Sequence, residues 1–510
     1  MSTKIYSAAV IGLSCELVEV EADVVPNLPK FYIVGLPDVA VKESKQRVRS
    51  AIKNSGLTWP RGQINVNLAP ADLKKAGPAY DLPIALSILI ADSKLKLNPE
   101  DDRSIFVGEL GLDGHLRPIN GILSIAIMAR DKKIKKIFLP KQNAPEASLI
   151  QGIEVYPIDS LSQIFLHLRQ EKLIDNYKDG FNLDQFENKN KWNSKYDMAF
   201  IKGQEHVKRA LEIAAAGQHN ILMTGPPGSG KTLLARTMPT ILPQMTIEES
   251  LEVTRIYSVA GILPGNKPLM DERPFRSPHH TASGVSLVGG GTWPKPGEIS
   301  LAHRGVLFLD EFPEFPRSVL DSLRQPLEDG IINISRAAGT LQFPAKFILL
   351  ASMNPCPCGF YNDPDRDCSC TQMQINNYQR KISGPLMDRI DIHIQVPRIN
   401  FEKLSGEDAG EKSAKIRQRV NQARSRQTNR FKNMKLVNNS EMSSNEVRNI
   451  CLIDSHSRDM LKNAVEQLHL SPRAYHRILK LSRTIADLGQ SEKIEKQHIA
   501  EALQYRPRVE

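Results

Sequence analysis

The residues best suited to chemistry lie in one short segment, Ile221–Thr232, which reads ILMTGPPGSGKT. Its apolar start predicts a buried parallel strand, and the pattern G-x-x-x-x-G-K-T follows directly. Glycines allow backbone N–H groups to surround phosphate oxygens, Lys231 can reach the β and γ phosphates, and the Thr232 hydroxyl can ligate Mg²⁺. The segment therefore predicts a site for ATP and Mg²⁺, against the alternative of a Gly/Pro turn that binds nothing. The predicted nucleotide-binding residues are Gly225, Pro226, Pro227, Gly228, Ser229, Gly230, Lys231 and Thr232.

Two later apolar runs also end in polar residues and extend this prediction. GVLFLDEF, at 305–312, predicts a buried strand that ends in Asp310 and Glu311. Asp310 would hold the Mg²⁺ shell together with Thr232, and Glu311 would orient and polarise the attacking water. The alternative for this pair is a plain turn after a core strand. FILLASMNP, at 347–355, predicts another strand, after which Asn354 could hydrogen-bond the γ-phosphate or the attacking water.

Two arginines complete the predicted catalytic set. Arg389, in SGPLMDRIDIHIQV, suits a finger that stabilises transition-state charge on a neighbour's nucleotide, which requires an oligomeric ring. Its alternative is an ordinary salt bridge with a neighbouring aspartate. Arg473, near the start of a predicted helix, would be a second sensor that couples a lid to the nucleotide, or else a solvated arginine. The predicted catalytic residues are Lys231, Asp310, Glu311, Asn354, Arg389 and Arg473.

Four of the six cysteines are bunched with the spacing C-x-C-x9-C-x-C. Four thiolates suit a tetrahedral Zn²⁺ ion, and the turn-rich residues between the two pairs would allow them to meet. Such a zinc would be structural, since no open coordination position is suggested. The alternative is a set of reduced thiols without metal. The candidate ligands are Cys356, Cys358, Cys368 and Cys370.

The elements that position these groups follow from the length and the pattern of the chain. A length of 510 residues predicts several domains. Residues 1–170 alternate short apolar runs with helical stretches, which indicates an α+β domain. Residues 171–197 are polar and predict a linker. Residues 198–398 predict a P-loop α/β core, and 399–510 predict a bundle of helices that forms a lid.

Composition and charge restrict the partners and the cell compartment that we expect for this protein. Lysine and arginine total 67 against 57 acidic residues, and the resulting charge of +10 points weakly to a polyanionic partner. No run approaches the roughly 20 apolar residues of a membrane span, and the start is not a signal peptide. Six cysteines in so long a chain do not suggest a disulfide scaffold. These features predict a cytoplasmic protein without a membrane partner.

The first domain resembles the Lon-protease-type fold, which also occurs in the RadA recombination ATPase. The resemblance rests on AYDLPIALSILI, GELGLDGHLRPINGILSIAIMAR and KKIFLPKQNAPEA. A Lon-type site needs a serine nucleophile and a lysine base. The corresponding positions here hold Ala79 and Leu123, which can neither attack nor accept a proton, so we expect a domain without protease activity. The alternative is an alignment slip that hides a real dyad.

The remainder resembles an AAA+ ATPase of the magnesium-chelatase-like group, and within it the bacterial ComM/YifB family. The motifs that carry the resemblance are GPPGSGKT, RPFRSPHHT, GGGTWPKPGEISLAHRGVLFLDEF, NPCPCG and SGPLMDRIDI. The resemblance implies an AAA+ α/β core, a ring that is a hexamer, and ATP hydrolysis with Mg²⁺. It also implies helicase activity and branch migration on single-stranded or branched DNA during recombination. The expected process is integration of DNA in natural transformation, with recombination proteins as further partners.

Two basic features are candidates for the DNA contact. IINISRAAGTLQFPAKF predicts a β-hairpin that resembles the pore loop of MCM-like motors, and Arg336 occupies the basic position near its tip. Small neighbours would let Arg336 approach a phosphate backbone without reading bases, whereas the alternative is a plain surface hairpin. A basic helix further on either touches nucleic acid or is solvated; its arginines are Arg417, Arg419, Arg424, Arg426 and Arg430.

Two other classes of function remain open on sequence alone. A chelatase-like or chaperone-like motor would remodel a protein partner, but pores that thread protein usually carry an aromatic–hydrophobic pair, and none is obvious in IINISRAAGTLQ. An ATP-dependent Lon-like protease is disfavoured by Ala79 and Leu123.

Overall fold

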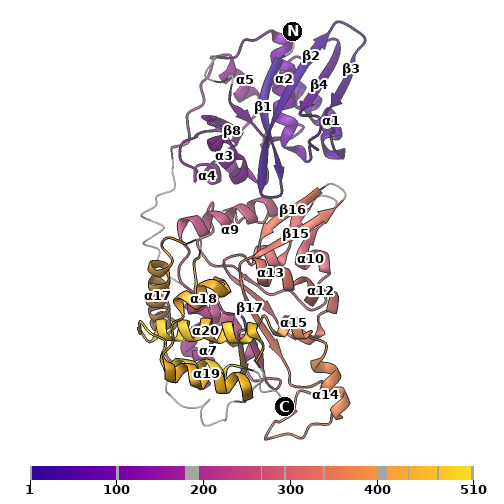
Figure 1. The fold of residues 1–510 in the computed structure, drawn as a ribbon. Coiled ribbons are helices and arrows are strands. Elements are labelled where there is room, and N and C mark those ends of the chain that lie inside the picture. Colours follow the sequence, from indigo (N-terminus) through magenta and orange to yellow (C-terminus); the bar gives the residue numbers. More distant parts are fainter. Residues whose placement is uncertain are drawn as a thin grey trace. The chain divides into compact units, whose positions relative to one another are not determined.

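A computed structural model describes residues 3–98, 101, 103–178, 195–265, 267–291, 294–336, 339–398, 410–434, 436–467 and 470–506 (Figure 1). The chain forms two compact units. The first contains residues 1–188 and 250–270, and the second contains residues 189–249 and 271–510. Among the described helices, none combines the length and the apolar character needed to cross a bilayer. Residues 179–194 of the expected linker lie outside the described residues.

The first unit is built on a seven-stranded sheet with the order β3-β4-β2-β1-β5-β8-β9. A long antiparallel hairpin of β1 and β2 lies in the middle, and β5, β8 and β9 continue the sheet in parallel. The strands are β1 Thr3–Ile11, β2 Ser14–Val25, β3 Lys30–Val34, β4 Gln63–Ala69, β5 Ile105–Phe106, β8 Lys136–Pro140 and β9 Glu154–Ile158, with a small β6 Glu109–Leu110 and β7 Leu116–Arg117 ribbon.

Alternation along the strands gives this sheet two buried faces. Along β1, Ile5 and Ala9 enter one core, whereas Ala8 and Val10 pack into the other. Helices α1, α2 and α5 supply the first core, and α3 and α4 supply the second. These helices are α1 Val39–Asn54, α2 Asp81–Ser93, α3 Ile122–Asp131, α4 Ala144–Ala147 and α5 Leu161–Leu168. A mixed sheet covered on both faces by helices is the expected α+β domain.

A segment from the middle of the chain also belongs to the first unit. Residues 250–270 include most of α9, which is Ile247–Ala260. Arg255 donates to the Ser124 hydroxyl over 3.1 Å and to the Leu13 carbonyl, and the Gly121 N–H donates to the Ser258 hydroxyl over 3.1 Å. The expected ATPase core, 198–398, is therefore interrupted, because this part of it packs with the first domain.

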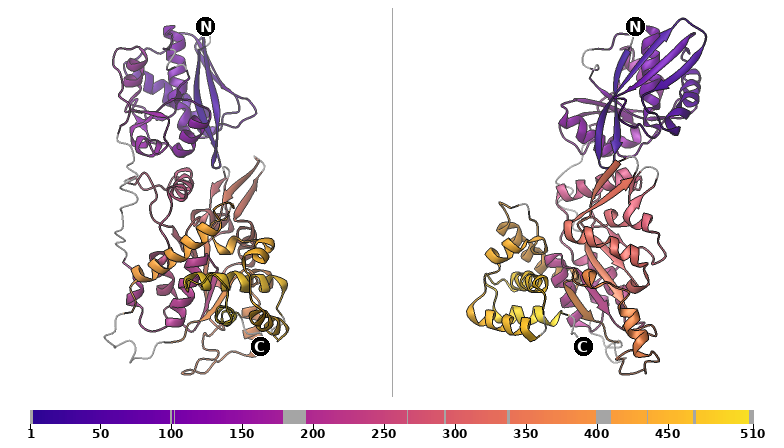
Figure 2. Two further views of the ribbon diagram at one scale, coloured as in Figure 1. Left: turned by 60° about the vertical axis from the view of Figure 1, so that its left-hand side comes forward. Right: turned by 45° about the vertical axis from the view of Figure 1, so that its right-hand side comes forward.

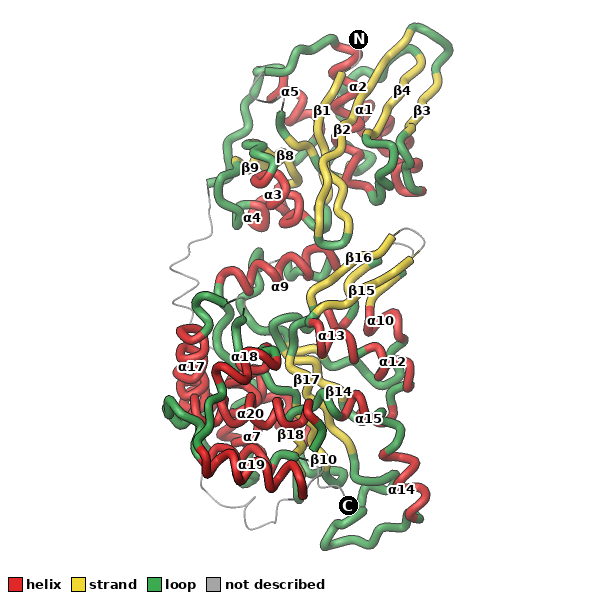
Figure 3. Tube along the Cα trace, viewed as in Figure 1, coloured by secondary structure: helices red, strands yellow, loops and turns green. Residues whose placement is uncertain are grey.

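The second unit is organised around a five-stranded sheet with the order β11-β14-β17-β10-β18, in which every neighbouring pair is parallel. Figure 3 shows β14, β17, β10 and β18 side by side. The strands are β10 Ile221–Thr224, β11 Phe275–Arg276, β14 Val306–Leu309, β17 Ile348–Met353 and β18 Ile392–Gln395. Each of β10, β14 and β17 carries an almost continuous apolar run, as strands buried on both faces require.

Helices flank this sheet and form the C-terminal bundle, which Figure 2 shows in yellow gathered on one side of the second unit. The helices next to the sheet are α7 Glu205–Gly217, α8 Lys231–Ile241, α10 Gly284–Val288, α11 Glu298–Leu301, α12 Arg317–Ser322, α13 Arg324–Asp329, α14 Gln372–Gln379 and α15 Gly384–Met387. The bundle helices are α17 Ser413–Arg430, α18 Ser444–Ile450, α19 Ser455–Gln467, α20 Pro472–Leu488 and α21 Lys496–Gln504. The expected α/β core with a helical lid is confirmed.

Two hairpins are inserted between the strands of the core sheet. The longer one pairs β15, Ile331–Arg336, with β16, Gly339–Pro344, and lies between β14 and β17 in sequence, as the alternating pattern predicted. Residues 337 and 338 at its tip lie outside the described residues. The Gly/Pro/His-rich stretch at 273–303 contains the shorter hairpin, β12 Gly289–Gly290 with β13 Lys295–Pro296.

Candidate active site

The phosphate loop connects β10 to α8, so the strand delivers the loop and the helix begins at Lys231. Gly230 has φ +86°, which a glycine adopts without strain, and a Cβ on Gly225 would lie 2.2 Å from the Val396 carbonyl oxygen. The loop is packed against β18 at Gly225 and turns sharply at Gly230. Both glycines of the motif are therefore required by the backbone itself.

Lys231 points back into this loop. Its ammonium donates to the carbonyls of Gly225 over 2.7 Å and Pro226 over 2.9 Å, and it lies 3.3 Å from the Asn354 side-chain oxygen. Burial lowers the pKa of Lys231, and the Asp310 carboxylate counteracts part of that shift. A buried ammonium bonded to loop carbonyls is ready to exchange them for phosphate oxygens.

Thr232 and Asp310 face each other at the same edge of the sheet. The Thr232 hydroxyl donates to Asp310 over 2.8 Å, and the Ser352 hydroxyl also bonds the Asp310 carboxylate. Because β10, β14 and β17 are parallel neighbours, the residues after their carboxyl ends converge here. A hydroxyl and a carboxylate are the hard oxygen donors that Mg²⁺ prefers, so these two residues fit the ion that the motif implies.

Glu311 lies beside this pair in the left-handed backbone region, with φ +52°. Its side chain is 58 % exposed and one carboxylate oxygen lies 3.0 Å from the His280 Nδ1 atom. The left-handed conformation is uncommon for a non-glycine residue and turns Glu311 away from the path of β14. His280 belongs to the Gly/Pro/His-rich stretch at 273–303, which the sequence predicts to be functional because it is too long for a simple connection, but its place beside Glu311 was not predicted.

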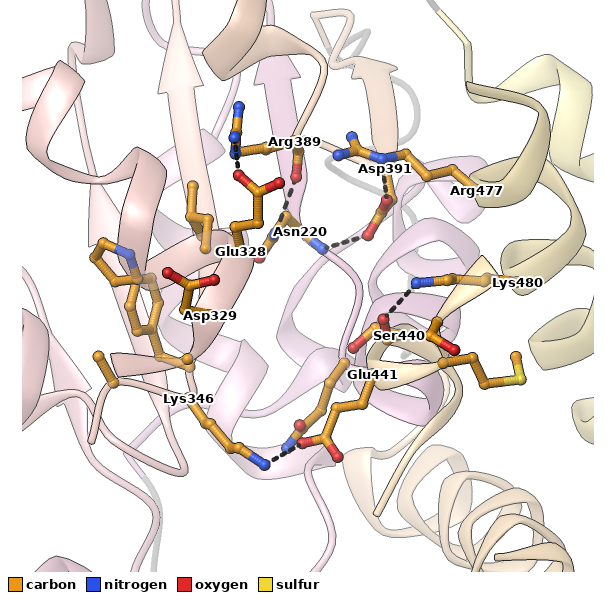
Figure 4. A pocket seen from close by; sticks show the side chains of 18 of the residues that line it. Asn220, Glu328, Asp329, Lys346, Arg389, Asp391, Ser440, Glu441, Arg477 and Lys480 are labelled. Atoms are coloured by element: carbon orange, nitrogen blue, oxygen red, sulfur yellow. Dashed lines mark hydrogen bonds and ion pairs between the residues drawn. The ribbon is translucent and has the colours of Figure 1, made fainter. Parts of the chain in front are cut away.

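Arg389 and Arg473 lie elsewhere in the second unit, at the amino edge of the sheet. They line a cavity of about 500 Å³ that also includes Asn220, Phe347 and Asp391, the residues that lead into β10, β17 and β18 (Figure 4). The phosphate loop follows the opposite end of β10. In one subunit the two arginines therefore face away from Lys231 and towards the same cavity.

Glu328 connects the two arginines of this cavity. It bonds the Arg389 guanidinium, and its second oxygen lies 3.6 Å from the Arg473 guanidinium. The Arg389 hydrogen bond lowers the pKa of Glu328. The expected alternative for Arg389 was a salt bridge with Asp388 or Asp391, whereas the ion pair that forms uses Glu328. Glu328 could not be recognised from the sequence, because it is one acidic residue among several on α12 and α13.

The four bunched cysteines converge. Their sulfur atoms all lie within 4.8 Å of one another, and three of the separations are 3.3, 3.6 and 3.7 Å. Four thiolates around one zinc at about 2.3 Å would lie roughly 3.8 Å apart. Backbone N–H groups of Gly359 and Tyr361 donate to the Cys356 sulfur. The donor set and its supporting hydrogen bonds fit a tetrahedral zinc site.

This cysteine loop also touches the nucleotide loop. A Cβ on Gly359 would lie 2.6 Å from the Pro227 ring, so the two backbones are in close contact. Gln379 of α14 donates to the Pro355 carbonyl next to Asn354. The loop between β17 and β18 therefore packs against the phosphate loop on one side and holds the segment that carries Asn354.

The predicted DNA-contacting residues fall into two groups. Arg336 ends β15, opposite Gly339, and its side chain lies outside the described residues. Of the basic helix, now α17, two arginines form ion pairs inside the second unit: Arg419 pairs with Glu212 and Glu411, and Arg430 pairs with Asp487. The Arg419 side chain is still 40 % exposed, whereas that of Arg430 is 22 % exposed.

Leu123 lies in the core of the first unit and Ala79 lies at the edge of that core; these are the two positions at which the sequence predicts that a Lon-type dyad is lost. Leu123 is fully buried, and Ala79 packs against the same apolar cluster. The Leu123 N–H donates to Glu146 over 3.0 Å, and burial raises the pKa of Glu146 to about 7. Two apolar side chains in contact with a closed core can supply neither a nucleophile nor a base.

Comparison with known proteins agrees with this arrangement. The chain is 45 % identical to competence protein ComM of Haemophilus influenzae over 99 % of this chain and 97 % of that protein. It is 42 % identical to YifB of Escherichia coli over 98 % of this chain and 96 % of that protein. This chain belongs to the ComM/YifB family. Because the identity is this high over nearly the full length, both units share their folds with these relatives.

Family models match the same chain in three parts. The model of magnesium chelatase, subunit ChlI, matches residues 197–404, and the model of its C-terminal part matches 410–506. A further model, subunit ChlI of Mg-chelatase, matches residues 20–143 in the first unit. A Lon protease of Lachnoclostridium phytofermentans is 23 % identical over 31 % of this chain and 22 % of that protein. The family is therefore one of magnesium-chelatase-like AAA+ ATPases, which use ATP and Mg²⁺.

Proposed function

We propose that this protein is a ring-forming ATPase that translocates on DNA and drives helicase activity and branch migration in recombination. The process that we assign to it is integration of incoming DNA during natural transformation, in the cytoplasm. The observation that carries the proposal is the similarity along the whole chain to a protein named for competence. The ATPase part of the proposal rests on the convergence of Lys231, Thr232, Asp310 and Asn354 at one edge of the sheet.

The residues at that edge have separate tasks in hydrolysis. Lys231 binds the β and γ phosphates once its loop carbonyls are displaced, and Thr232 with Asp310 holds Mg²⁺. The ion neutralises charge on the phosphates. Glu311 orients the attacking water, and His280 fixes the Glu311 carboxylate by its 3.0 Å contact. Asn354, held next to Lys231, senses the γ-phosphate.

Arg389 and Arg473 complete the site of the neighbouring subunit in a hexameric ring. Within one chain they lie at the amino edge of the sheet, whereas the phosphate loop lies at the carboxyl edge. A head-to-tail ring joins two different faces of neighbouring subunits, and in this proposal they are the amino edge of one sheet and the carboxyl edge of the next. Both arginines therefore act in trans, where their charge stabilises the transferring phosphoryl group.

Mixing two inactive variants tests this assignment. Arg389→Ala subunits keep an intact phosphate loop, and Lys231→Ala subunits keep an intact finger. Mixed rings should recover part of the hydrolysis, because some interfaces join an intact finger to an intact loop. Arg398→Ala, another arginine near β18, is the matched control and should not abolish hydrolysis. Failure to recover hydrolysis in rings shown to be mixed would contradict the trans role.

Single-stranded or branched DNA is the proposed substrate, and Arg336 is the proposed contact. Arg336 ends β15 of the β15–β16 hairpin, and the residues that follow it in the sequence are small, which would let a guanidinium approach a phosphate. Arg336→Ala should keep basal hydrolysis but reduce its stimulation by DNA, similarly for every sequence tested. DNA binding should also depend less steeply on salt, since fewer counterions are released. Unwinding as fast as that of the unaltered protein would contradict the contact.

The second candidate is a motor that remodels a protein partner, as a chelatase or chaperone does. The match to magnesium-chelatase models favours it. It differs from the first candidate in one observable: its ATPase rate would not respond to forked DNA.

Recombination proteins are the further partners that the first candidate implies, and their stimulation of branch migration is measurable in the same assay.

Structural zinc is the remaining part of the proposal. Purified protein should contain about one zinc per chain, bound by Cys356, Cys358, Cys368 and Cys370. Cys368→Ser should release it, whereas Cys15→Ser, which alters a buried cysteine of the first unit, should not. Metal analysis that finds no zinc in folded, active protein would favour reduced thiols.

A further inference from the structure

The Arg389 side chain is withdrawn in this structure, which means that its guanidinium is bonded to Pro385 and Glu328 of its own subunit. Its side chain is only 12 % exposed, and one guanidinium nitrogen donates to the Pro385 carbonyl over 2.7 Å. The Nε atom is buried and makes no hydrogen bond within the described part of the chain. A finger that must reach another subunit's phosphate cannot do so from this position, so it has to leave the wall of the cavity first.

The side chain that holds it is Glu328, in the last turn of α13. The Glu328 side chain is 51 % exposed and its other oxygen faces Arg473, whose side chain is 62 % exposed (Figure 4 labels Glu328 and Arg389). One half-exposed carboxylate thus serves both arginines that the proposed function assigns to the neighbour's nucleotide. Two other cations of the cavity have carboxylate partners of their own, since Arg477 lies 3.7 Å from Asp391 and Lys346 lies 3.1 Å from Glu441.

We propose that Glu328 is a retaining residue, which keeps Arg389 withdrawn until a neighbouring subunit presents bound ATP. The phosphate oxygens then replace the Glu328 carboxylate as the hydrogen-bond acceptors of Arg389. The exchange substitutes one charge-assisted hydrogen bond for another, so it is easily reversed. This inference rests on the proposed trans role of Arg389. Glu328 does not itself touch the nucleotide; it sets how often the finger is free.

The solvent exposure of the Glu328–Arg389 ion pair limits how much removal of the Glu328 carboxylate can change the rate of ATP hydrolysis. An ion pair that is half open to water is weak, so its loss should shift the position of Arg389 only a few-fold. Glu328→Gln keeps the size of the side chain and removes its charge. We expect this variant to raise kcat for ATP about two- to fivefold, with KM for ATP little changed, because ground-state binding of the phosphates stays with Lys231.

Salt provides a readout that a merely structural role would not give. Ions screen a half-exposed pair, so the unaltered protein should approach the rate of Glu328→Gln as ionic strength rises. Asp329→Asn is the matched control, since it removes the next acidic charge of the same turn and should leave kcat unchanged. Glu328→Asp, which keeps the carboxylate, should lie between Glu328→Gln and the unaltered protein. Melting temperatures of the purified variants establish that they are folded.

Arg389→Ala, alone and combined with Glu328→Gln, separates this inference from the proposed function. The double variant should be as inactive as Arg389→Ala, because the carboxylate acts only through the finger. If Arg389→Ala hydrolyses ATP normally, the trans assignment itself is wrong. If Arg389→Ala is inactive while Glu328→Gln has an unchanged or lower kcat, the trans role of Arg389 is supported and the retaining role of Glu328 is overturned.

Discussion

The two units of this chain differ in the side chains that stand where catalytic residues are expected from the sequence. In the second unit, Lys231 and Asp310 are polar side chains held by hydrogen bonds to the loop and to Thr232. In the first unit, Leu123 belongs to an apolar core and Ala79 packs against it, at the two positions where the resemblance to Lon-type proteases predicts a base and a nucleophile. The second unit thus keeps polar side chains at a strand edge, whereas these two positions of the first unit are apolar.

The difference shows that charged side chains in a site need hydrogen-bond partners around them. A buried ammonium or carboxylate is costly unless hydrogen bonds compensate it, and the loop carbonyls and hydroxyls around Lys231 and Asp310 supply them. The apolar side chains of Ala79 and Leu123 are stabilised by packing, while the Leu123 N–H bonds the buried Glu146 carboxyl. Contacts that α9 makes through Arg255 and Ser258 add to this closed face of the first unit.

Removing the catalytic carboxylate should give the largest effect. Glu311→Gln should still bind ATP but hydrolyse it at least about a hundredfold more slowly, because an amide cannot polarise the attacking water. Lys231→Ala should instead weaken nucleotide binding itself. Fluorescent-nucleotide binding and single-turnover hydrolysis separate the two. Glu314→Gln, three residues further on, is the control. Hydrolysis by Glu311→Gln at the normal rate would show that this edge is not the active site.

Truncating Leu123 in the first unit should instead cost stability. Leu123→Ala deletes a fully buried side chain and should lower the free energy of unfolding of the first unit by about 2–5 kcal/mol. Leu112→Ala, at a position 57 % exposed, is the control and should cost far less. Hydrogen exchange of peptides from residues 103–178 reports on this unit. An equal, small effect of both variants would mean that Leu123 does not belong to a closed core.

The buried carboxyl beside Leu123 should give the smallest effect. The folded-state pKa of Glu146 is about 7, raised from its ordinary 4.5 by burial. The folded state therefore binds the proton more tightly, and stability falls as pH rises from about 4.5 to about 7, by up to about 3 kcal/mol. Glu146→Gln should remove this part of the pH dependence. An unchanged slope in that variant would show that Glu146 is ionised as in water.

Much of this could be predicted from the sequence, because the decisive signals are local. Apolar runs that end in Thr224, Leu309 and Met353 identify parallel strands, and the polar residues after them meet at one edge by topology alone. The bunched cysteines converge for a similar reason, since a short turn-rich loop brings the two pairs together. Capping is local as well: α1 begins directly after Asp38, whose carboxylate accepts a hydrogen bond from the Val41 N–H.

Other features depend on contacts between residues far apart in the chain. His280 reaches Glu311 only because β11 lies beside β14, and Glu328 reaches Arg389 only because α13 lies beside the start of β18. Residues 250–270 pack with the first unit through Arg255 and Ser258, although the ATPase motifs precede and follow them. The domain boundaries other than this interruption, and the roles of the site residues, stay predictions.

The most direct test of the proposed function is the rate of ATP hydrolysis with and without forked DNA. The account predicts that forked DNA accelerates hydrolysis by the full-length protein and that the branch is moved or unwound in the same reaction. Glu311→Gln should bind the fork without moving it. A rate that forked DNA leaves unchanged, in protein that hydrolyses ATP and assembles into rings, would contradict the DNA motor and favour a protein substrate.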